Sequence, residues 1–351
     1  MRGAQATMSL EREQSLEAAL AKLERVHLAS VRPTPLEALP RLSAALGGPP
    51  LYIKRDDLTG LAFGGNKTRM LEFSLADAKA QGAEVVVTGA AVQSNYCRQM
   101  AAACAKLGLE LYLVVAPHRE IDKHEVQGNA FLQRLFGAKV TVLEDHDRRR
   151  QGEALKAKAE ELRQAGKKVY VPRQEETIDL DAIAYAEVAL EIVRQCREQG
   201  IDPEYAYVSA LDTTQAGLVM GFAYLRSPIQ VRGISPFQGA PERTQNMARI
   251  ANQAVRRLGI DLRLSERDFD NDDSWVGERY GIPSGEGIDT LHLVAKTEGI
   301  LLDPVYTSKA MAALIAAIRQ EALDKHSPVL FVHTGGAPAL FGYTREVMGA
   351  G

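Results

Sequence analysis

The feature that most constrains the fold of this chain is a repeated alternation of short β-branched runs with helix-patterned stretches. The helical stretches are about ten to twenty residues long, which is enough to join two parallel strands. The alternation therefore predicts parallel sheets with helices on both faces. We expect strands at Leu51–Arg55, Glu84–Thr88, Glu110–Val115, Lys139–Leu143, Lys168–Val171, Tyr205–Val208, Ile229–Ile234 and Val329–His333. So many strands favour two α/β domains over a single sheet.

The N-terminal region predicts one further helix. Leu16, Leu20 and Leu23 recur at helical spacing, which indicates an amphipathic helix over residues Ser15–Val26. The segment Arg32–Leu36 contains two prolines, which disfavour helix, so we expect it to be extended.

The composition narrows the classes of protein and of partner. The 351 residues carry a net charge of -3, so the chain has no basic surface that would suit nucleic acid or an anionic membrane. Residues Met1–Glu13 are too polar for a signal peptide, and no segment reaches the roughly 18 apolar residues of a membrane span. Cys97, Cys104 and Cys196 lack the spacing of a metal site. We expect a soluble cytoplasmic protein without a metal.

Lys67 is the first candidate for chemistry. It stands in Ala62-Phe-Gly-Gly-Asn-Lys-Thr-Arg69, between a strand-like and a helix-like run. Glycines let the backbone pass close by, and a lysine desolvated there can present a neutral amine to an aldehyde. Most lysines are solvated surface groups, so this loop alone is a weak indication of Schiff-base chemistry.

A second loop, Thr88–Tyr96, also follows an expected strand. Ser94 or Asn95 is a suitable cap for the helix that follows. The backbone amides at such a helix start suit a carboxylate, although capping alone also accounts for these residues.

Two further loops follow later strands. Ser209–Leu218 offers hydroxyls and amides that suit an anion, whereas Asp212 within it does not. His333–Gly336 contains paired glycines, which either allow a flat ligand to approach the backbone or form a tight turn. Ligands of open α/β sheets bind beyond the carboxyl ends of strands, which is where all these loops lie.

Taken together, six motifs resemble the family of D-cysteine desulfhydrases and 1-aminocyclopropane-1-carboxylate (ACC) deaminases, which are pyridoxal-phosphate (PLP) enzymes of fold type II, the tryptophan synthase β-like fold. The motifs are Gly64–Arg69, Gln93–Asn95, Thr214–Gly217, Tyr280–Pro283, Glu298–Tyr306 and His333–Gly336. The resemblance extends from about Arg32 to about Tyr343, and six motifs in order are far more specific than one.

The resemblance implies an α/β fold of two domains, each a mostly parallel sheet flanked by helices. A smaller domain over residues 70–171 would be inserted into a larger PLP-binding domain formed by residues 1–69 and 172–351. The cofactor would lie between them, the substrate would be a small amino acid, and the protein would be a homodimer.

The resemblance also implies roles for individual residues. Lys67 would bind PLP as a Schiff base, Asn95 would lie near the ring hydroxyl, and Ser94 would receive the substrate carboxylate. The catalytic set would be Lys67, Ser94, Tyr280 and Tyr306. Cofactor binding would involve Lys67, Asn95, Thr213, Thr214, Gln215, Ala216, Gly217, Thr307, Thr334 and Gly335, and substrate binding would involve Gln93, Ser94, Asn95 and Tyr96.

Thr307 and Thr334 favour one branch of the family. ACC deaminases have Glu where this chain has Thr307 and Leu where it has Thr334. A hydroxyl beside the pyridine nitrogen makes the PLP ring a weaker electron sink than a glutamate does. Elimination of a good β-leaving group needs a less strong electron sink than the ACC deaminase reaction does. We therefore expect β-elimination that yields pyruvate, ammonia and sulfide, or sulfite from cysteate. ACC deaminase, or another PLP lyase or racemase of small amino acids, is the alternative.

The phosphate loop is where the chain departs from its relatives. They have glycine where Ala210–Thr213 stand, and Asp212 brings a carboxylate near a group of roughly -2 charge. That is repulsive unless Asp212 points away or caps the helix. Tyr96 and Phe237 are also atypical. These changes support a second alternative, a non-catalytic member of the family.

Overall fold

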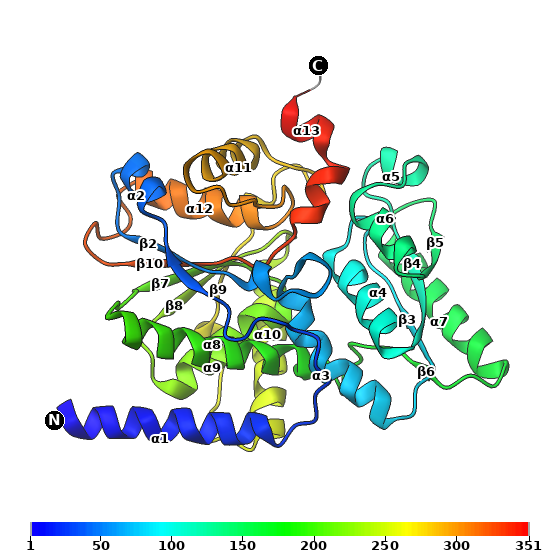
Figure 1. The fold of residues 1–351 in the computed structure, drawn as a ribbon, viewed down its shortest axis with the longest axis horizontal. Coiled ribbons are helices and arrows are strands. Elements are labelled where there is room, and N and C mark those ends of the chain that lie inside the picture. The colour runs from blue at the N-terminus through cyan, green and yellow to red at the C-terminus, as the bar shows by residue number, and fades with distance from the viewer. Residues whose placement is uncertain (1, 350–351) are drawn as a thin grey trace.

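The computed structural model describes residues 2–349 and contains two sheets (Figure 1). The six-stranded sheet has the order β1 (Leu36–Ala38), β2 (Leu51–Lys54), β10 (Val329–Val332), β7 (Tyr205–Ser209), β8 (Gln230–Ile234) and β9 (Asp270–Asp272). In it β1 pairs antiparallel with β2, and the other neighbours are parallel. The four-stranded sheet has the parallel order β5 (Lys139–Val142), β4 (Glu110–Val115), β3 (Val85–Thr88) and β6 (Val169–Tyr170).

All eight expected strands are present, and β1 and β9 are additional. β9 reads Asp-Asn-Asp, which has none of the β-branched residues that predict a strand. The strands of the four-stranded sheet all lie between residues 85 and 170. The expected division of the chain at residues 70 and 171 stays a prediction, and its first boundary falls inside the helix α3, residues Asn66–Ala80.

Helices cover both faces of each sheet. The remaining helices are α1 (Arg2–Ala21), α2 (Pro40–Leu46), α4 (Asn95–Leu107), α5 (Ile121–His124), α6 (Gly128–Leu135), α7 (Arg148–Gln164), α8 (Asp179–Gln199), α9 (Asp212–Leu225), α10 (Ala240–Leu258), α11 (Gly285–Glu298), α12 (Thr307–Arg319) and α13 (Thr344–Met348). In β10, Leu330 and Val332 pack with α8, α9 and α10, whereas Val329 and Phe331 pack with α2, α11 and α12. Burial on both faces explains why the strands read as continuous apolar runs.

The N-terminal helix differs from the prediction. It spans Arg2–Ala21, so it begins earlier and ends earlier than the expected Ser15–Val26. Beyond its end the backbone is held by tertiary hydrogen bonds: the Val26 amide donates to the Glu72 carbonyl, and the Leu28 amide donates to the Glu72 carboxylate at 2.9 Å. These contacts replace the bonds that a longer helix would make.

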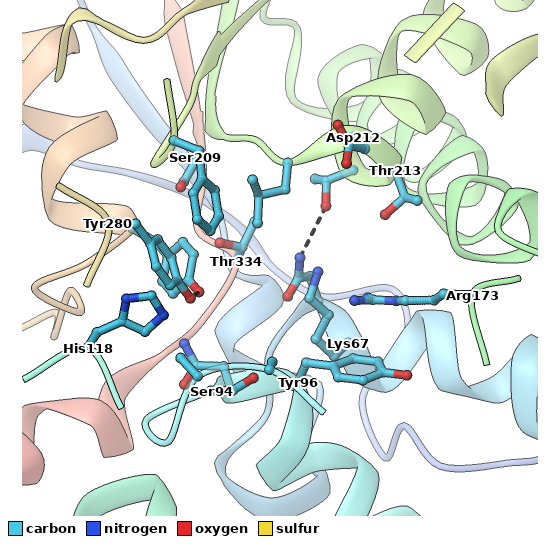
Figure 2. Close-up of a pocket in the computed structure, with 18 of the residues that line it drawn as sticks. Lys67, Ser94, Tyr96, His118, Arg173, Ser209, Asp212, Thr213, Tyr280 and Thr334 are labelled. Atoms are coloured by element: carbon cyan, nitrogen blue, oxygen red, sulfur yellow. Dashed lines mark hydrogen bonds between the residues drawn. The ribbon is translucent and has the colours of Figure 1, made fainter. Parts of the chain in front are cut away.

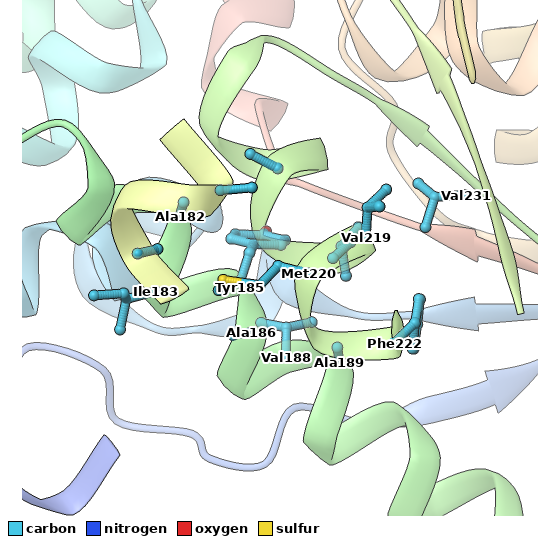
Figure 3. Close-up of a cluster of buried hydrophobic side chains, with 14 of the residues drawn as sticks. Ala182, Ile183, Tyr185, Ala186, Val188, Ala189, Val219, Met220, Phe222 and Val231 are labelled. Atoms are coloured by element: carbon cyan, nitrogen blue, oxygen red, sulfur yellow. The ribbon is translucent and has the colours of Figure 1, made fainter. Parts of the chain in front are cut away.

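The largest core cluster fills the space where α8 meets α9 (Figure 3). Gly217 and Gly221 make this contact possible, because a Cβ at Gly217 would lie 2.1 Å from the Ala182 carbonyl oxygen and one at Gly221 would lie 2.5 Å from the Ala189 Cβ. Gly217 therefore has a packing role whatever else it does. This contact fixes the direction in which α9 begins.

A buried ion-pair cluster fixes the start of α3. The Arg69 guanidinium donates to the Glu191 carboxylate at 2.7 Å and to Asp56 at 3.0 Å, and Lys54 donates to Glu191 at 2.7 Å. The side chains of Arg69, Asp56 and Lys54 are fully buried. Because Arg69 lies two residues after Lys67, the cluster holds the helical turn that carries Lys67.

We expect Arg69→Met to lower the free energy of unfolding by about 3 to 5 kcal/mol, because it leaves the carboxylates of Asp56 and Glu191 without their main partner in the protein interior. Urea unfolding would measure the change. Arg150→Met is the control, since the Arg150–Asp145 pair is 63% and 45% exposed and its loss should cost at most about 1 kcal/mol. Equal small changes in both variants would contradict the role of the cluster.

Candidate active site

A cavity of about 330 Å³ is lined by segments from both sheets (Figure 2). Ala90 and Ala91 follow β3, Leu211 follows β7, and Thr334 follows β10. The cavity therefore lies beyond the carboxyl ends of parallel strands, where α/β proteins bind ligands.

Lys67 enters this cavity from the first turn of α3. The two glycine loops meet beside it: a Cβ at Gly335 would lie 2.7 Å from the Gly65 Cα, and the Asn66 amide donates to the Thr334 carbonyl at 3.0 Å. Gly65 and Gly335 have φ of 122° and 94°, which favour glycine. Glycine at both positions thus lets the backbones touch and brings Lys67 and Thr334 to one cavity.

The amine of Lys67 is unusually easy to deprotonate. Burial, with a smaller contribution from the positive charge of Arg173, lowers the pKa of Lys67 to about 7 against the opposing effect of Asp181 and Asp212. A large share of the amine is therefore neutral near pH 7 and able to act as a nucleophile.

We expect acylation of Lys67 in the cofactor-free protein to reach half its maximal rate near pH 7, because the neutral form reacts and is populated above the pKa. Peptide mass spectrometry after labelling at a series of pH values would measure it. Lys139 is the control, since hydrogen bonds to Tyr112 and Glu110 raise the pKa of this exposed amine. Labelling of both lysines with the same pH profile would contradict the assignment.

Ser94 caps the helix α4, as expected from the sequence. Its Oγ accepts a hydrogen bond from the Cys97 amide at 3.2 Å, and its side chain lines the cavity. Capping leaves the hydroxyl hydrogen free for an acceptor, and the first backbone amides of α4 have no partner within the helix.

Asn95 is held in one orientation by two buried neighbours. Its Oδ1 accepts from Arg98 Nη1 at 2.9 Å and from Asn129 Nδ2 at 2.9 Å. Arg98 is itself fixed, because its Nη2 donates to the Gly64 carbonyl at 2.7 Å. The Asn95 amide group therefore has its N–H hydrogens left to donate in the cavity that it lines.

Tyr280 and Tyr306 form a hydrogen-bonded pair through their hydroxyls. Phe237 stacks on the Tyr280 ring with centroids 3.9 Å apart, and His118 meets its edge at 4.7 Å. Burial raises the pKa of Tyr280 to about 12 and also raises the pKa of Tyr306. Both phenols are therefore protonated at neutral pH and can donate a proton.

The start of α9 holds the residues expected to bind phosphate. Thr213 and Thr214 are buried and line the cavity, and Asn66 Nδ2 donates to Thr214 Oγ1 at 3.2 Å. Asp212 is 37% exposed and accepts from Arg243 Nη1 of α10 at 3.4 Å. The positive charge of Arg243 thus offsets the negative charge of the Asp212 carboxylate, which would otherwise repel a bound anion.

Other residues with expected roles do not line this cavity. Gln215 Nε2 donates to the Asp270 carbonyl at 2.6 Å, the Thr307 hydroxyl donates to Asp303 at 2.8 Å, and Gln93 donates to the Gln127 carbonyl at 3.1 Å. Ala216 and Gly217 are buried in α9. Their roles in binding stay predictions, whereas the cavity is lined by Lys67, Ser94, Asn95, Tyr96, Thr213, Thr214, Tyr280, Tyr306, Thr334 and Gly335.

Sequence reasoning gave no role to several side chains of the cavity, among them Arg173, His118, His146 and Arg148. Arg173 follows the two-residue strand β6 in a segment without glycine or a known motif. The one available signal was its place after an expected strand. His118 is neutral at neutral pH, since burial, with a smaller contribution from His146, lowers its pKa to about 4.

The donors of this cavity fit PLP. A lysine amine of low pKa, an amide N–H fixed at Asn95, a hydroxyl at Thr334 and a helix start with two buried threonines face one space. An aldehyde, a ring hydroxyl, a pyridine nitrogen and a phosphate are the groups they would match. Together with the parallel sheets, they define a PLP-dependent enzyme of fold type II.

Comparison with known proteins agrees with this class. Residues 28–335 match the family model of pyridoxal-phosphate-dependent enzymes, and the chain belongs to that family. The D-cysteine desulfhydrases of Salmonella typhi and of Salmonella newport (strain SL254) are each 38% identical over 320 residues, which cover 90% of this chain and 95% of the relative. The resemblance inferred from the motifs and the cofactor are thereby confirmed.

Solved structures agree with the fold. A crystal structure of an ACC deaminase homologue is 33% identical, with a TM-score of 0.85, and the match covers 95% of this chain and 98% of the other. Apo diaminopropionate ammonia lyase from Escherichia coli is 17% identical with a TM-score of 0.63 and shares the fold alone. The expected fold class is confirmed. No helix within residues 2–349 is long and apolar enough to cross a membrane.

Proposed function

We propose that this enzyme catalyses PLP-dependent β-elimination from a small amino acid, as a D-cysteine desulfhydrase does, and releases pyruvate, ammonia and sulfide. The observation that supports it most is a lysine amine with a pKa of about 7 in one cavity with two protonated tyrosines. Elimination needs both a base for the Cα proton and an acid for the leaving group. The relatives named D-cysteine desulfhydrase support the choice of substrate.

Each residue of the cavity named here has a separate role in the proposed reaction. Bound PLP supplies an electron sink for the charge that develops at Cα. The amine of Lys67 would hold the cofactor and would accept the Cα proton of the substrate. Ser94 and the first amides of α4 hold the substrate carboxylate. The fixed amide of Asn95 would donate to the ring hydroxyl of the cofactor, and the Thr334 hydroxyl would be the partner of its pyridine nitrogen.

Tyr280 and Tyr306 complete the reaction. Since both phenols are protonated, one of them donates a proton to the β-substituent as it leaves, and the other stabilises the resulting phenolate through their shared hydrogen bond. Aminoacrylate is released and hydrolyses to pyruvate and ammonia. Phe237 packs on Tyr280 and fixes the position of the acid.

A second candidate substrate is cysteate, whose β-substituent is an anionic sulfonate. The Arg148 guanidinium lines the cavity and lies 4.4 Å from the Phe237 ring centroid, on the side of the tyrosine pair. A cation there favours a charged β-substituent. The non-catalytic alternative loses its main support, because Asp212 is paired with Arg243.

One assay tests these choices. The purified enzyme is given D-cysteine, L-cysteine, L-cysteate and ACC, and pyruvate, sulfide and sulfite are measured. We expect sulfide and pyruvate from D-cysteine in equal amounts. Sulfite from L-cysteate would select the second candidate, and turnover of ACC alone would overturn the proposal.

We further propose that the enzyme is a cytoplasmic homodimer that does not bind nucleic acid. The family resemblance supports the dimer, and the net charge of -3 argues against nucleic acid. Light scattering of the purified protein would measure its mass.

A further inference from the structure

Arg173 is held in an unusual position at the edge of the cavity. Its φ of 60° is left-handed, a conformation that is unfavourable for a non-glycine residue and is kept where the surroundings fix it. Its Nε donates to Asp181 Oδ2 at 2.8 Å, and Asp181 is 2% exposed in the first turn of α8. Its guanidinium carbon lies 3.8 Å from the centroid of the Tyr96 ring. The side chain is thus fixed from two sides.

The remaining donors of Arg173 are free. Within residues 2–349 no hydrogen-bond partner is present for its two terminal nitrogens, and the side chain lines the cavity. Figure 2 shows the guanidinium directed toward Lys67, with Thr213 and Asp212 on the same side and with Tyr280 and His118 on the opposite side. A planar guanidinium presenting two free N–H groups is suited to a phosphate or a carboxylate.

The start of α9 needs a cation if it is to hold a phosphate. The loop Ala210–Asp212 contains no glycine to let amides converge, and Asp212 adds a negative charge at the helix start. Arg243 pairs with Asp212 and so cancels that charge without supplying a further one. A phosphate of roughly -2 charge would then have the helix start and two threonine hydroxyls but no cation from α9.

We propose that Arg173 binds the phosphate of PLP together with Thr213 and the start of α9, and so replaces the cradle that glycine would form in the loop before α9. The cofactor phosphate is favoured over the substrate as its ligand, because Thr213 lies on the same side of the cavity as Arg173, whereas Tyr280, which would act on the leaving group, lies on the opposite side (Figure 2). The proposal concerns cofactor binding alone, so it does not depend on which amino acid is the substrate.

Binding of PLP and of pyridoxal to the cofactor-free enzyme tests this proposal, because pyridoxal lacks the phosphate. The double variant Arg173→Met/Asp181→Asn removes both charges and so leaves no buried carboxylate unpaired. We expect its affinity for PLP to fall roughly 10- to 100-fold, the range for loss of hydrogen bonds to a charged group. Its affinity for pyridoxal should change less than about 3-fold. Titration followed by absorbance measures both.

Three further variants make the result specific. Asp181→Asn alone and Arg148→Met, which removes another cavity arginine, should keep the preference for PLP over pyridoxal. Arg173→Lys retains a charge and should lose less affinity for PLP than the double variant. Circular dichroism and thermal unfolding of each cofactor-free variant establish that it is folded.

Inorganic phosphate provides a readout that does not require PLP. It should raise the melting temperature of the cofactor-free wild type and of Arg173→Lys more than that of the double variant. If the double variant does not fold, the comparison of wild type with Arg173→Lys decides, and identical preference for PLP in the two would overturn the proposal. An equal loss of affinity for PLP and pyridoxal would overturn it, as would an unchanged PLP affinity with a raised KM for the amino acid.

Discussion

Replacing Lys67 by alanine is expected to abolish turnover and the visible absorbance of bound PLP. The variant removes the amine that bonds the cofactor and the base that accepts the Cα proton, so we expect kcat to fall by at least about four orders of magnitude. The fold should be unaffected, because Lys67 is anchored by Arg69 and Asn66 on either side and makes one weak side-chain contact, with Met70 Sδ at 3.6 Å. Absorbance spectra and pyruvate release measure the two losses.

Two controls separate this effect from general damage. Lys79→Ala changes an exposed lysine at the other end of α3 and should leave both readouts unchanged. Borohydride treatment of the wild type should fix the cofactor to the peptide that contains Lys67, which mass spectrometry would detect. A cofactor fixed to another lysine, or a Lys67→Ala variant that retains turnover, would refute the assignment.

The sheets could be predicted because their strands are buried on both faces. β3 reads Val-Val-Val-Thr and β10 reads Val-Leu-Phe-Val, and all their residues are buried. An edge strand is under no such constraint, which is why the polar β9 was missed. The end of α1 was also misplaced, because hydrogen bonds to Glu72, far along the chain, decide it.

The loops of the active site could be predicted because glycines and capping residues mark them. Gly65 and Gly335 are needed where two backbones touch, and Ser94 caps α4 as its position after a strand suggests. Local signals thus marked these loops as candidates, and the family resemblance implied that Lys67, Ser94 and Thr334 belong to one site.

Side chains whose role depends on distant partners could not be predicted. Asp212 is paired with Arg243, which lies 31 residues further along and reaches it from another helix. The orientation of Asn95 depends on Asn129, 34 residues away, and Arg173 reaches the cavity by a backbone conformation that the sequence does not reveal. For Asp212 and Asn95 the deciding contact joins elements that are separate in the sequence.

Replacing Tyr280 by phenylalanine is expected to slow elimination from D-cysteine by about 10² to 10⁴, the usual contribution of a general acid. Thiolate leaves more readily when it is protonated, and burial keeps the Tyr280 phenol in its protonated form at neutral pH. Tyr306→Phe should have a similar effect, because it removes the hydrogen bond that stabilises the phenolate. PLP absorbance should be retained in both variants, and pyruvate release measures the rate.

Substrates with different leaving groups test whether the tyrosine pair acts as the acid. Chloride leaves without a proton, so β-chloro-D-alanine should be consumed by Tyr280→Phe at a rate within about 10-fold of wild type, while D-cysteine is not. Tyr224→Phe is the control, since its hydroxyl bonds Ser15 at 3.0 Å outside the cavity. A pair that merely shaped the cavity would slow both substrates alike. Loss of a proton donor would slow D-cysteine but not β-chloro-D-alanine, because the acid protonates the departing thiolate in the transition state, whereas chloride departs without a proton.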